Sequence, residues 1–134
     1  AMFLPVLAGQ SGNTGCQALA VTLRGLTLGE LDDSKRRRLF VKEAWLGLLN
    51  GALVGVVAAL GMVGVALSQG RQDALQLGLG VWLAMVGSCA ISGVSGALVP
   101  LTLKKLGADP ATASSIFLTT ATDVVSPWAI TQAG

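Results

Sequence analysis

Polar side chains at four-residue spacing stand out in a chain that is otherwise apolar. Asp123 lies in the middle of the segment "SSIFLTTATDVVSPWAI", which is apolar or small at almost every other position. Ser115 and Thr119 precede it by eight and four residues, and Thr122 is its neighbour. Residues four apart share one face of a helix. The spacing therefore predicts a polar stripe ending in a carboxylate.

A second stripe lies near the start of the chain. Gly9, Asn13 and Gln17 are also four apart, and Gly12 lies between the first two. Glycines in the middle of a membrane helix loosen the backbone, which is tolerated mainly where it is buried in protein or lines a watery cavity. Two stripes of equal length predict a polar path if their helices face each other.

The donor atoms of these stripes define the chemistry. A charge in mid-bilayer costs several kcal/mol, so Asp123 is expected to face water, a partner or an ion. Pro127 lacks the N–H that would bond the carbonyl of Asp123, and this leaves a free carbonyl beside the carboxylate. The chain has no His, and Cys16 and Cys89 are isolated. Oxygen donors without sulfur or imidazole are typical of a site for a hard cation.

Charge placement predicts the elements that carry the stripes. Only 12% of the 134 residues are charged, and mean hydropathy is +0.69. Charge-free intervals span 1–23, 44–70, 74–103 and 110–122, and a bilayer crossing needs ~20 apolar residues. We expect an all-α membrane protein with one transmembrane domain over 1–134. Its four helices are predicted at about 2–28, 44–67, 75–103 and 110–133, with an amphipathic link at 29–43. Gly55, Gly61 and Gly64 are expected to be packing residues.

The basic residues predict an orientation. Eight of the nine lie near the first and third links, whereas the second link holds only Arg71. By the positive-inside rule, the face with the eight is cytoplasmic. The C-terminus is then outside, and a further helix is expected before residue 1. This places the chain in the plasma (or inner) membrane, without nucleic acid as a partner.

Four classes of function compete for these features. A soluble helical domain is disfavoured because 44–67 has no charged face. An intramembrane aspartyl protease needs two paired aspartates, and only Asp123 is available, so an enzyme is not expected. A structural module would hold Asp123 protonated. A proton-coupled carrier of divalent cations, with Asp123 as the proton site, is the nearest rival to a cation channel.

Two stretches resemble a known family. "FLPVLAGQSGNTGCQALAVTLRGLTLGEL", followed by "RRRLFVKEAWLGLLNG", resembles the second membrane helix and following link of the MgtE family of magnesium channels. "GALVPLTLKKLGADPATASSIFLTTATDV" resembles its fourth and fifth helices. The resemblance implies a five-helix homodimer whose first helix is missing here. It also implies an ion path at the subunit interface, lined by the helices predicted at 2–28 and 110–133.

The resemblance also assigns residues. It implies that Asp123 faces hydrated Mg²⁺, that the backbone carbonyls of Gly9 and Thr119 do the same, and that Asn13 lines the pore. A second pore asparagine of the family is replaced here by Ser115. Gln17, Thr122 and Gly12 are added as pore-lining candidates from the stripes. The expected function is Mg²⁺ transport. The alternative is a proton-coupled carrier with broader selectivity that includes Mn²⁺ and Co²⁺.

Overall fold

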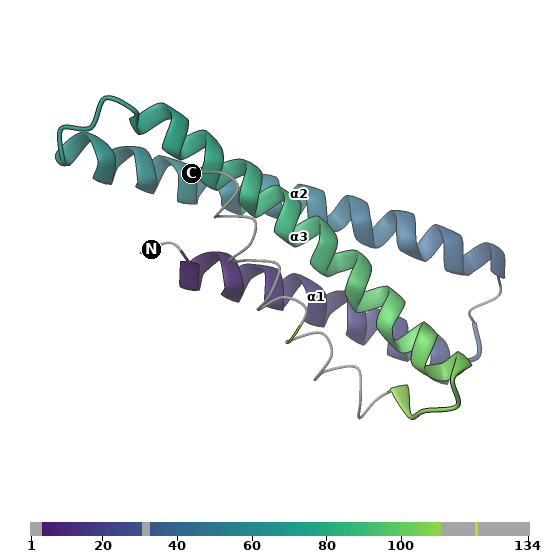
Figure 1. Ribbon diagram of the computed structural model, residues 1–134. Helices are drawn as coiled ribbons and strands as arrows, with labels where there is room; N and C mark the ends of the chain where they lie inside the picture. The colour runs from purple at the N-terminus through teal and green to yellow at the C-terminus, as the bar shows by residue number, and fades with distance from the viewer. Residues whose placement is uncertain (1–3, 31–32, 111–119, 121–134) are drawn as a thin grey trace.

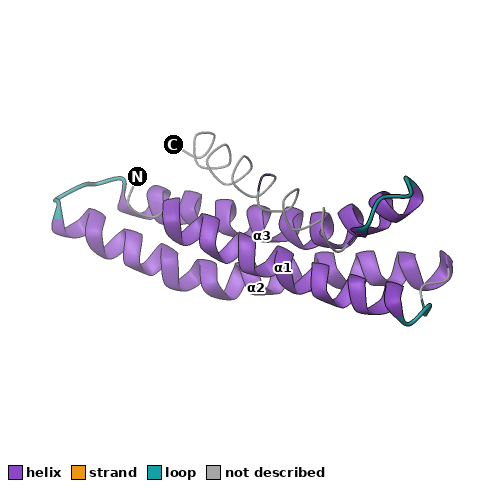
Figure 2. Cartoon of the chain, turned by 90° about the horizontal axis from the view of Figure 1, so that it is seen from below, coloured by secondary structure: helices purple, strands orange, loops and turns teal. Residues whose placement is uncertain are grey.

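The computed structural model of the chain describes residues 4–30, 33–110 and 120. This part of the chain contains three helices and no strand (Figures 1 and 2): α1 at Leu4–Thr27, α2 at Asp33–Ser68 and α3 at Ala74–Lys105. The prediction of an all-α protein is confirmed.

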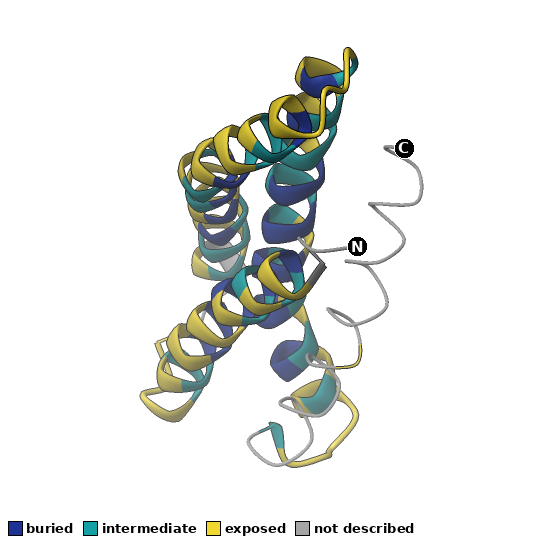
Figure 3. Cartoon of the chain, turned by 90° about the vertical axis from the view of Figure 1, so that its left-hand side faces the viewer, coloured by how far each residue is buried: buried dark blue, intermediate teal, exposed yellow. Residues whose placement is uncertain are grey.

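Helix α3 is the central element. It packs against α2 along much of its length and against α1, whereas α1 and α2 make few contacts with each other. The buried positions follow the inner faces of the helices (Figure 3). A small core joins Leu7, Ala58, Ala84, Met85 and Cys89. Because α1 and α2 meet α3 rather than each other, space is left between them.

Glycines set the close approach of α2 to α3. Gly47, Gly51 and Gly55 are four apart and buried. A Cβ atom at Gly47 would lie 2.6 Å from the carbonyl oxygen of Cys89, and one at Gly51 would lie 2.8 Å from Cα of Val86. Small residues at this spacing let membrane helices approach until their backbones touch.

The packing role predicted for three glycines of α2 is only partly right. Gly55 packs against Trp82 and Met85, as predicted. Gly61 and Gly64 are exposed, and a Cβ at Gly64 would meet no atom within 4 Å. These two predictions are therefore wrong for the packing of α2 against α1 and α3. The glycines that carry the contact, Gly47, Gly51 and Gly55, lie about two to five turns earlier.

Each of the three helices ends in the same way. Gly29, Gly70 and Gly107 have positive φ angles of 66°, 69° and 75°. Each follows the last helical residue by two positions, and its N–H and the next N–H bond back to carbonyls of the final turn. This is the Schellman arrangement, which favours glycine because other residues are strained at such φ angles.

Helix α2 corrects a predicted boundary. The helix begins at Asp33 rather than near residue 44, so most of the predicted link 29–43 continues it. The segment "DSKRRRLFVKE" contains no glycine or proline, and Arg, Lys, Leu and Glu favour helix, so nothing stops the helix there. With 36 residues, α2 is ~54 Å long at 1.5 Å per residue. It therefore exceeds the ~30 Å of a hydrocarbon core, and its basic first turns extend beyond it.

Two helices within the described part of the chain are long and apolar enough to cross a membrane: α2 over Lys35–Ser68, and α3. Helix α1 is not among them, because amides, hydroxyls and glycines interrupt it. The helix predicted at 110–133 lies almost wholly outside the described residues. The count of four membrane helices therefore stays a prediction.

Candidate functional site

The stripe predicted on α1 forms an open face. Gly9, Asn13 and Gln17 are all exposed, and Gly12 is half-buried. A Cβ atom at Gly9 or Gly12 would meet no other atom within 4 Å. Neither α2 nor α3 covers this face, so its amides and backbone are available to another surface or to water.

The opposite face of α1 is polar but closed. Ser11 and Thr22 are fully buried and Thr14 is nearly so. Their hydroxyls donate to carbonyls of the same helix three or four residues earlier, at 3.1, 2.8 and 3.0 Å. The Ser92 hydroxyl of α3 also donates to the carbonyl of Ser11. These bonds satisfy the buried hydroxyls and fix α1 on α3.

An amide of α2 joins this closed face. The Gln10 side-chain N–H donates to Oδ1 of Asn50 at 3.3 Å, and the Asn50 side-chain N–H donates to Oγ1 of Thr14 at 3.1 Å. Asn50 therefore forms hydrogen bonds to two residues of α1 that lie one turn apart. Because Gln10 and Thr14 each follow a residue of the exposed stripe, these two bonds also set the direction in which Gly9 and Asn13 point.

Sequence reasoning missed Asn50. A signal was present, because Asn50 is the one amide side chain between residues 44 and 67. Asn50 has no polar neighbour at helical spacing within its apolar segment, so the four-residue pattern of the stripes does not include it.

A cavity of about 430 Å³ lies between α1 and α2 beside this amide, with Thr14, Gln17 and Glu43 among its lining residues. Glu43 is only 5% exposed, and its Oε1 accepts no hydrogen bond from the described residues. Sequence reasoning placed this carboxylate at the end of the surface link. The continuous helix α2 places it in the protein instead. Gln17 thus borders both the cavity and the open stripe.

The remaining candidates lie outside the described residues: Asp123, Thr119, Ser115 and Thr122. Within residues 4–30, 33–110 and 120, no three His, Cys, Asp or Glu side chains gather as they would to hold a metal. Cys16 is exposed and Cys89 is buried, and both are free thiols, as the sequence indicates.

Comparison with known proteins identifies relatives along nearly the whole chain. The family model for the MgtE divalent cation transporters matches residues 4–131. The magnesium transporter MgtE of Enterococcus faecalis is 37% identical over 126 residues, covering 94% of this chain and 26% of that protein. Those of Bacillus subtilis and Thermus thermophilus are 36% and 35% identical, covering 94% and 92% of this chain.

These matches show the family of the chain and how much of each relative the chain covers. The chain spans about a quarter of the length of the curated relatives that it matches. Its long apolar helices, its polar first helix and the family match over nearly its whole length agree with one another. The chain belongs to the MgtE family of divalent cation transporters.

Proposed function

We propose that this chain forms the membrane part of a transporter that moves Mg²⁺ across the bilayer. The observation that carries the proposal is the open stripe of α1, in which Gly9, Asn13 and Gln17 are all exposed. Membrane helices rarely leave amides and bare backbone uncovered unless these line a path or an interface. Relatives named as magnesium transporters support the choice of ion.

The recognition chemistry suits a hydrated ion. Mg²⁺ releases its waters reluctantly and is held through few carboxylates. Asp123 supplies charge, while the carbonyl oxygens of Gly9 and Thr119 and the side-chain oxygen of Asn13 accept hydrogen bonds from the waters around the ion. Ser115, Gln17, Thr122 and Gly12 extend the polar wall. A site of this kind selects by size of the hydrated ion and by charge.

Two copies of the chain complete the path. In this proposal, α1 and the helix at 110–133 of each copy face a two-fold axis, so two Asp123 carboxylates share one ion. The basic ends of α1, α2 and α3 lie on the cytoplasmic side, and the C-terminus lies outside.

The test is Mg²⁺ flux into liposomes that contain the purified protein. Asp123→Asn nearly preserves size but removes the charge, and we expect it to lower flux at least about tenfold because about 1.4 kcal/mol or more of ion stabilisation is lost. Asp123→Glu keeps the charge but moves it by one bond, and we expect it to retain part of the flux.

Asp73→Asn is the matched control. Asp73 lies in the exposed link between α2 and α3, and it accepts hydrogen bonds from Arg71 at 2.9 and 2.7 Å. These bonds lower the pKa of Asp73, so this carboxylate is also charged at neutral pH. Its loss should leave flux unchanged. Equal flux in wild type and Asp123→Asn would make Asp123 structural. Proton movement coupled to Mg²⁺ entry would instead favour the proton-coupled carrier.

A further inference from the structure

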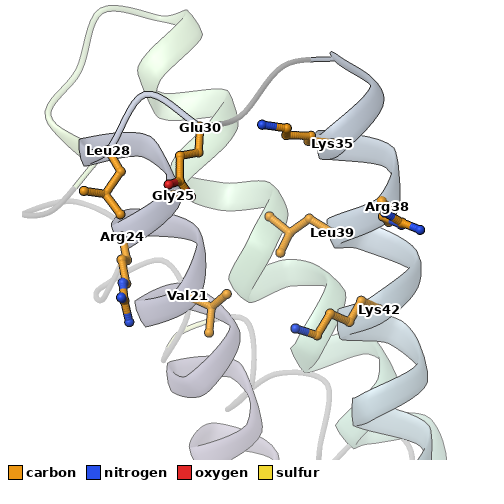
Figure 4. A pocket seen from close by; sticks show the side chains of 9 residues that line it. All are labelled: Val21, Arg24, Gly25, Leu28, Glu30, Lys35, Arg38, Leu39 and Lys42. Carbon is orange, nitrogen blue, oxygen red and sulfur yellow. The ribbon is translucent and has the colours of Figure 1, made fainter.

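A second polar feature lies away from the stripe, where α1 ends and α2 begins. A cavity of about 540 Å³ opens there between the two helices. Four basic residues line it: Arg24, Lys35, Arg38 and Lys42. Glu30 is the acidic residue of its lining. Figure 4 shows Lys35 and Lys42 turned from α2 toward α1.

The basic residues of this cavity are not neutralised by the described part of the chain. Within the described residues none of the four forms an ion pair, and the pair of Arg71 with Asp73 lies in the α2–α3 link. Among the described lining residues, four are basic and one, Glu30, is acidic. The cavity is therefore a concave surface of net positive charge.

The same cavity has an apolar side. Val21, Leu28 and Leu39 line it together with the cations. Lys35, Leu39 and Lys42 lie at positions i, i+4 and i+7, so one face of α2 presents an apolar side chain between two ammonium groups. Val21 lies deeper along α1, toward the membrane-spanning part of the chain.

Position selects among anionic ligands. The cavity lies at the basic first turns of α2, which precede the charge-free part of that helix from residue 44 onward. In a bilayer crossed by the charge-free part, these turns lie at headgroup level, where basic pockets between membrane helices bind anionic headgroups. A free phosphate would leave Val21, Leu28 and Leu39 uncovered, whereas an acyl chain would cover them.

We propose that this cavity is a binding site for an anionic phospholipid. The headgroup phosphate lies between Lys35 and Lys42 of α2, and the first part of an acyl chain follows Leu39 and Val21. Arg24 adds charge from α1. Arg38 adds charge at the outer edge. The site is independent of the ion path, so it holds whether or not the chain transports Mg²⁺.

The test measures lipid binding rather than transport. The protein is purified in a neutral detergent, and phosphatidylglycerol or phosphatidylcholine is titrated while bound lipid is counted by native mass spectrometry. The test variant is the double substitution Lys35→Gln and Lys42→Gln. The matched control is Lys104→Gln with Lys105→Gln, which removes the same charge at the end of α3, away from this cavity.

We expect phosphatidylglycerol to bind wild type and the control more tightly than phosphatidylcholine. The test variant should bind it about thirtyfold more weakly, because two basic residues each contribute roughly a factor of five. Circular dichroism and gel filtration check that both variants fold. Equal weakening in the two variants would reduce the effect to general surface charge and overturn the site.

Two further arms separate the other ligands. Inorganic phosphate, added at the same concentrations, should give no comparable protection against thermal unfolding. If it protects as well as phosphatidylglycerol, the site takes a free anion and the lipid proposal fails. In the last arm, an acidic peptide is added to the purified protein. If the peptide binds while phosphatidylglycerol binds no more tightly than phosphatidylcholine, the cavity takes a protein segment and the lipid proposal is overturned.

Discussion

Asn50 shows how a single side chain can control a site that it does not line. Its amide bonds Gln10 and Thr14 of α1 at 3.3 and 3.1 Å, on the side of the helix that faces α2. Rotation of α1 about its axis would break both bonds. The orientation of Gly9 and Asn13 therefore depends on a residue of another helix.

Substitution of Asn50 tests this dependence. Asn50→Leu keeps a similar volume and removes both cross-helix hydrogen bonds, each worth roughly 1 kcal/mol inside a membrane protein. We expect the unfolding free energy, measured by denaturant titration in detergent, to fall by about 1–2 kcal/mol. The matched substitution is Asn13→Leu, at an exposed amide. It should change stability little but reduce Mg²⁺ flux. An unchanged unfolding free energy in Asn50→Leu would show that the two hydrogen bonds from Asn50 to α1 do not stabilise the fold.

Glu43 is the second residue whose role depends on its helix. A carboxylate at the end of a surface link would be solvated, but α2 continues through this position and brings Glu43 to 5% exposure. Its burial beside Gln17 and Asn50 makes the space between α1 and α2 polar at this depth. The cavity there combines these polar side chains with apolar ones, among them Leu46, Leu49 and Leu53.

At the scale of elements, the sequence predicted which helices form better than it predicted which of their faces touch. The charge-free intervals identified the region of α3 to within two residues at each end, because a long apolar run with polar flanks has one reading. The start of α2 was placed about eleven residues late, because the charged stretch 29–43 was predicted to be a separate amphipathic link rather than the first turns of the same helix. Charged residues end a membrane span but not a helix, and "SKRRRLFVKE" propagates one readily.

The glycines illustrate the same limit. Gly47, Gly51, Gly55, Gly61 and Gly64 all lie in one apolar helix, and only the first three of them meet α3. The four-residue spacing of the first three is visible in the sequence. Which face of α2 packs against α3 depends also on the residues of α3, and no pattern within α2 alone contains that information. The candidates at 115–123 lie outside the described residues, so their placement stays a prediction.

The orientation of the helices gives a prediction at this scale. If the basic ends are cytoplasmic, the α2–α3 link is outside. In a background without Cys16 and Cys89, Gln72→Cys should react with a membrane-impermeant maleimide added to intact cells. Ala108→Cys, which follows α3, should react only after the cells are permeabilised. Both positions are exposed, so access to the reagent is matched. The opposite labelling pattern would invert the chain in the membrane.

At the scale of the whole molecule, the question is what covers the exposed polar face of α1. Helix α1 closes one polar face against α2 and α3 and leaves the other open, with Asn13 at its centre. In the proposed path, Asp123 of one chain would offer a single negative charge to a doubly charged ion. A second copy related by a two-fold axis would cover the open face and supply the second charge.

Cross-linking between copies tests this arrangement. Asn13→Cys, in a background where Cys16 and Cys89 are Ser, places a thiol at the centre of the open face. A short bifunctional thiol reagent should join two such chains in membranes, because symmetry brings identical residues together at a two-fold axis. Leu75→Cys is the control: it is 78% exposed at the start of α3 and is not expected near the axis. Dimers formed by Leu75→Cys but not by Asn13→Cys would move the interface away from α1, and the two Asp123 carboxylates could then no longer share one ion.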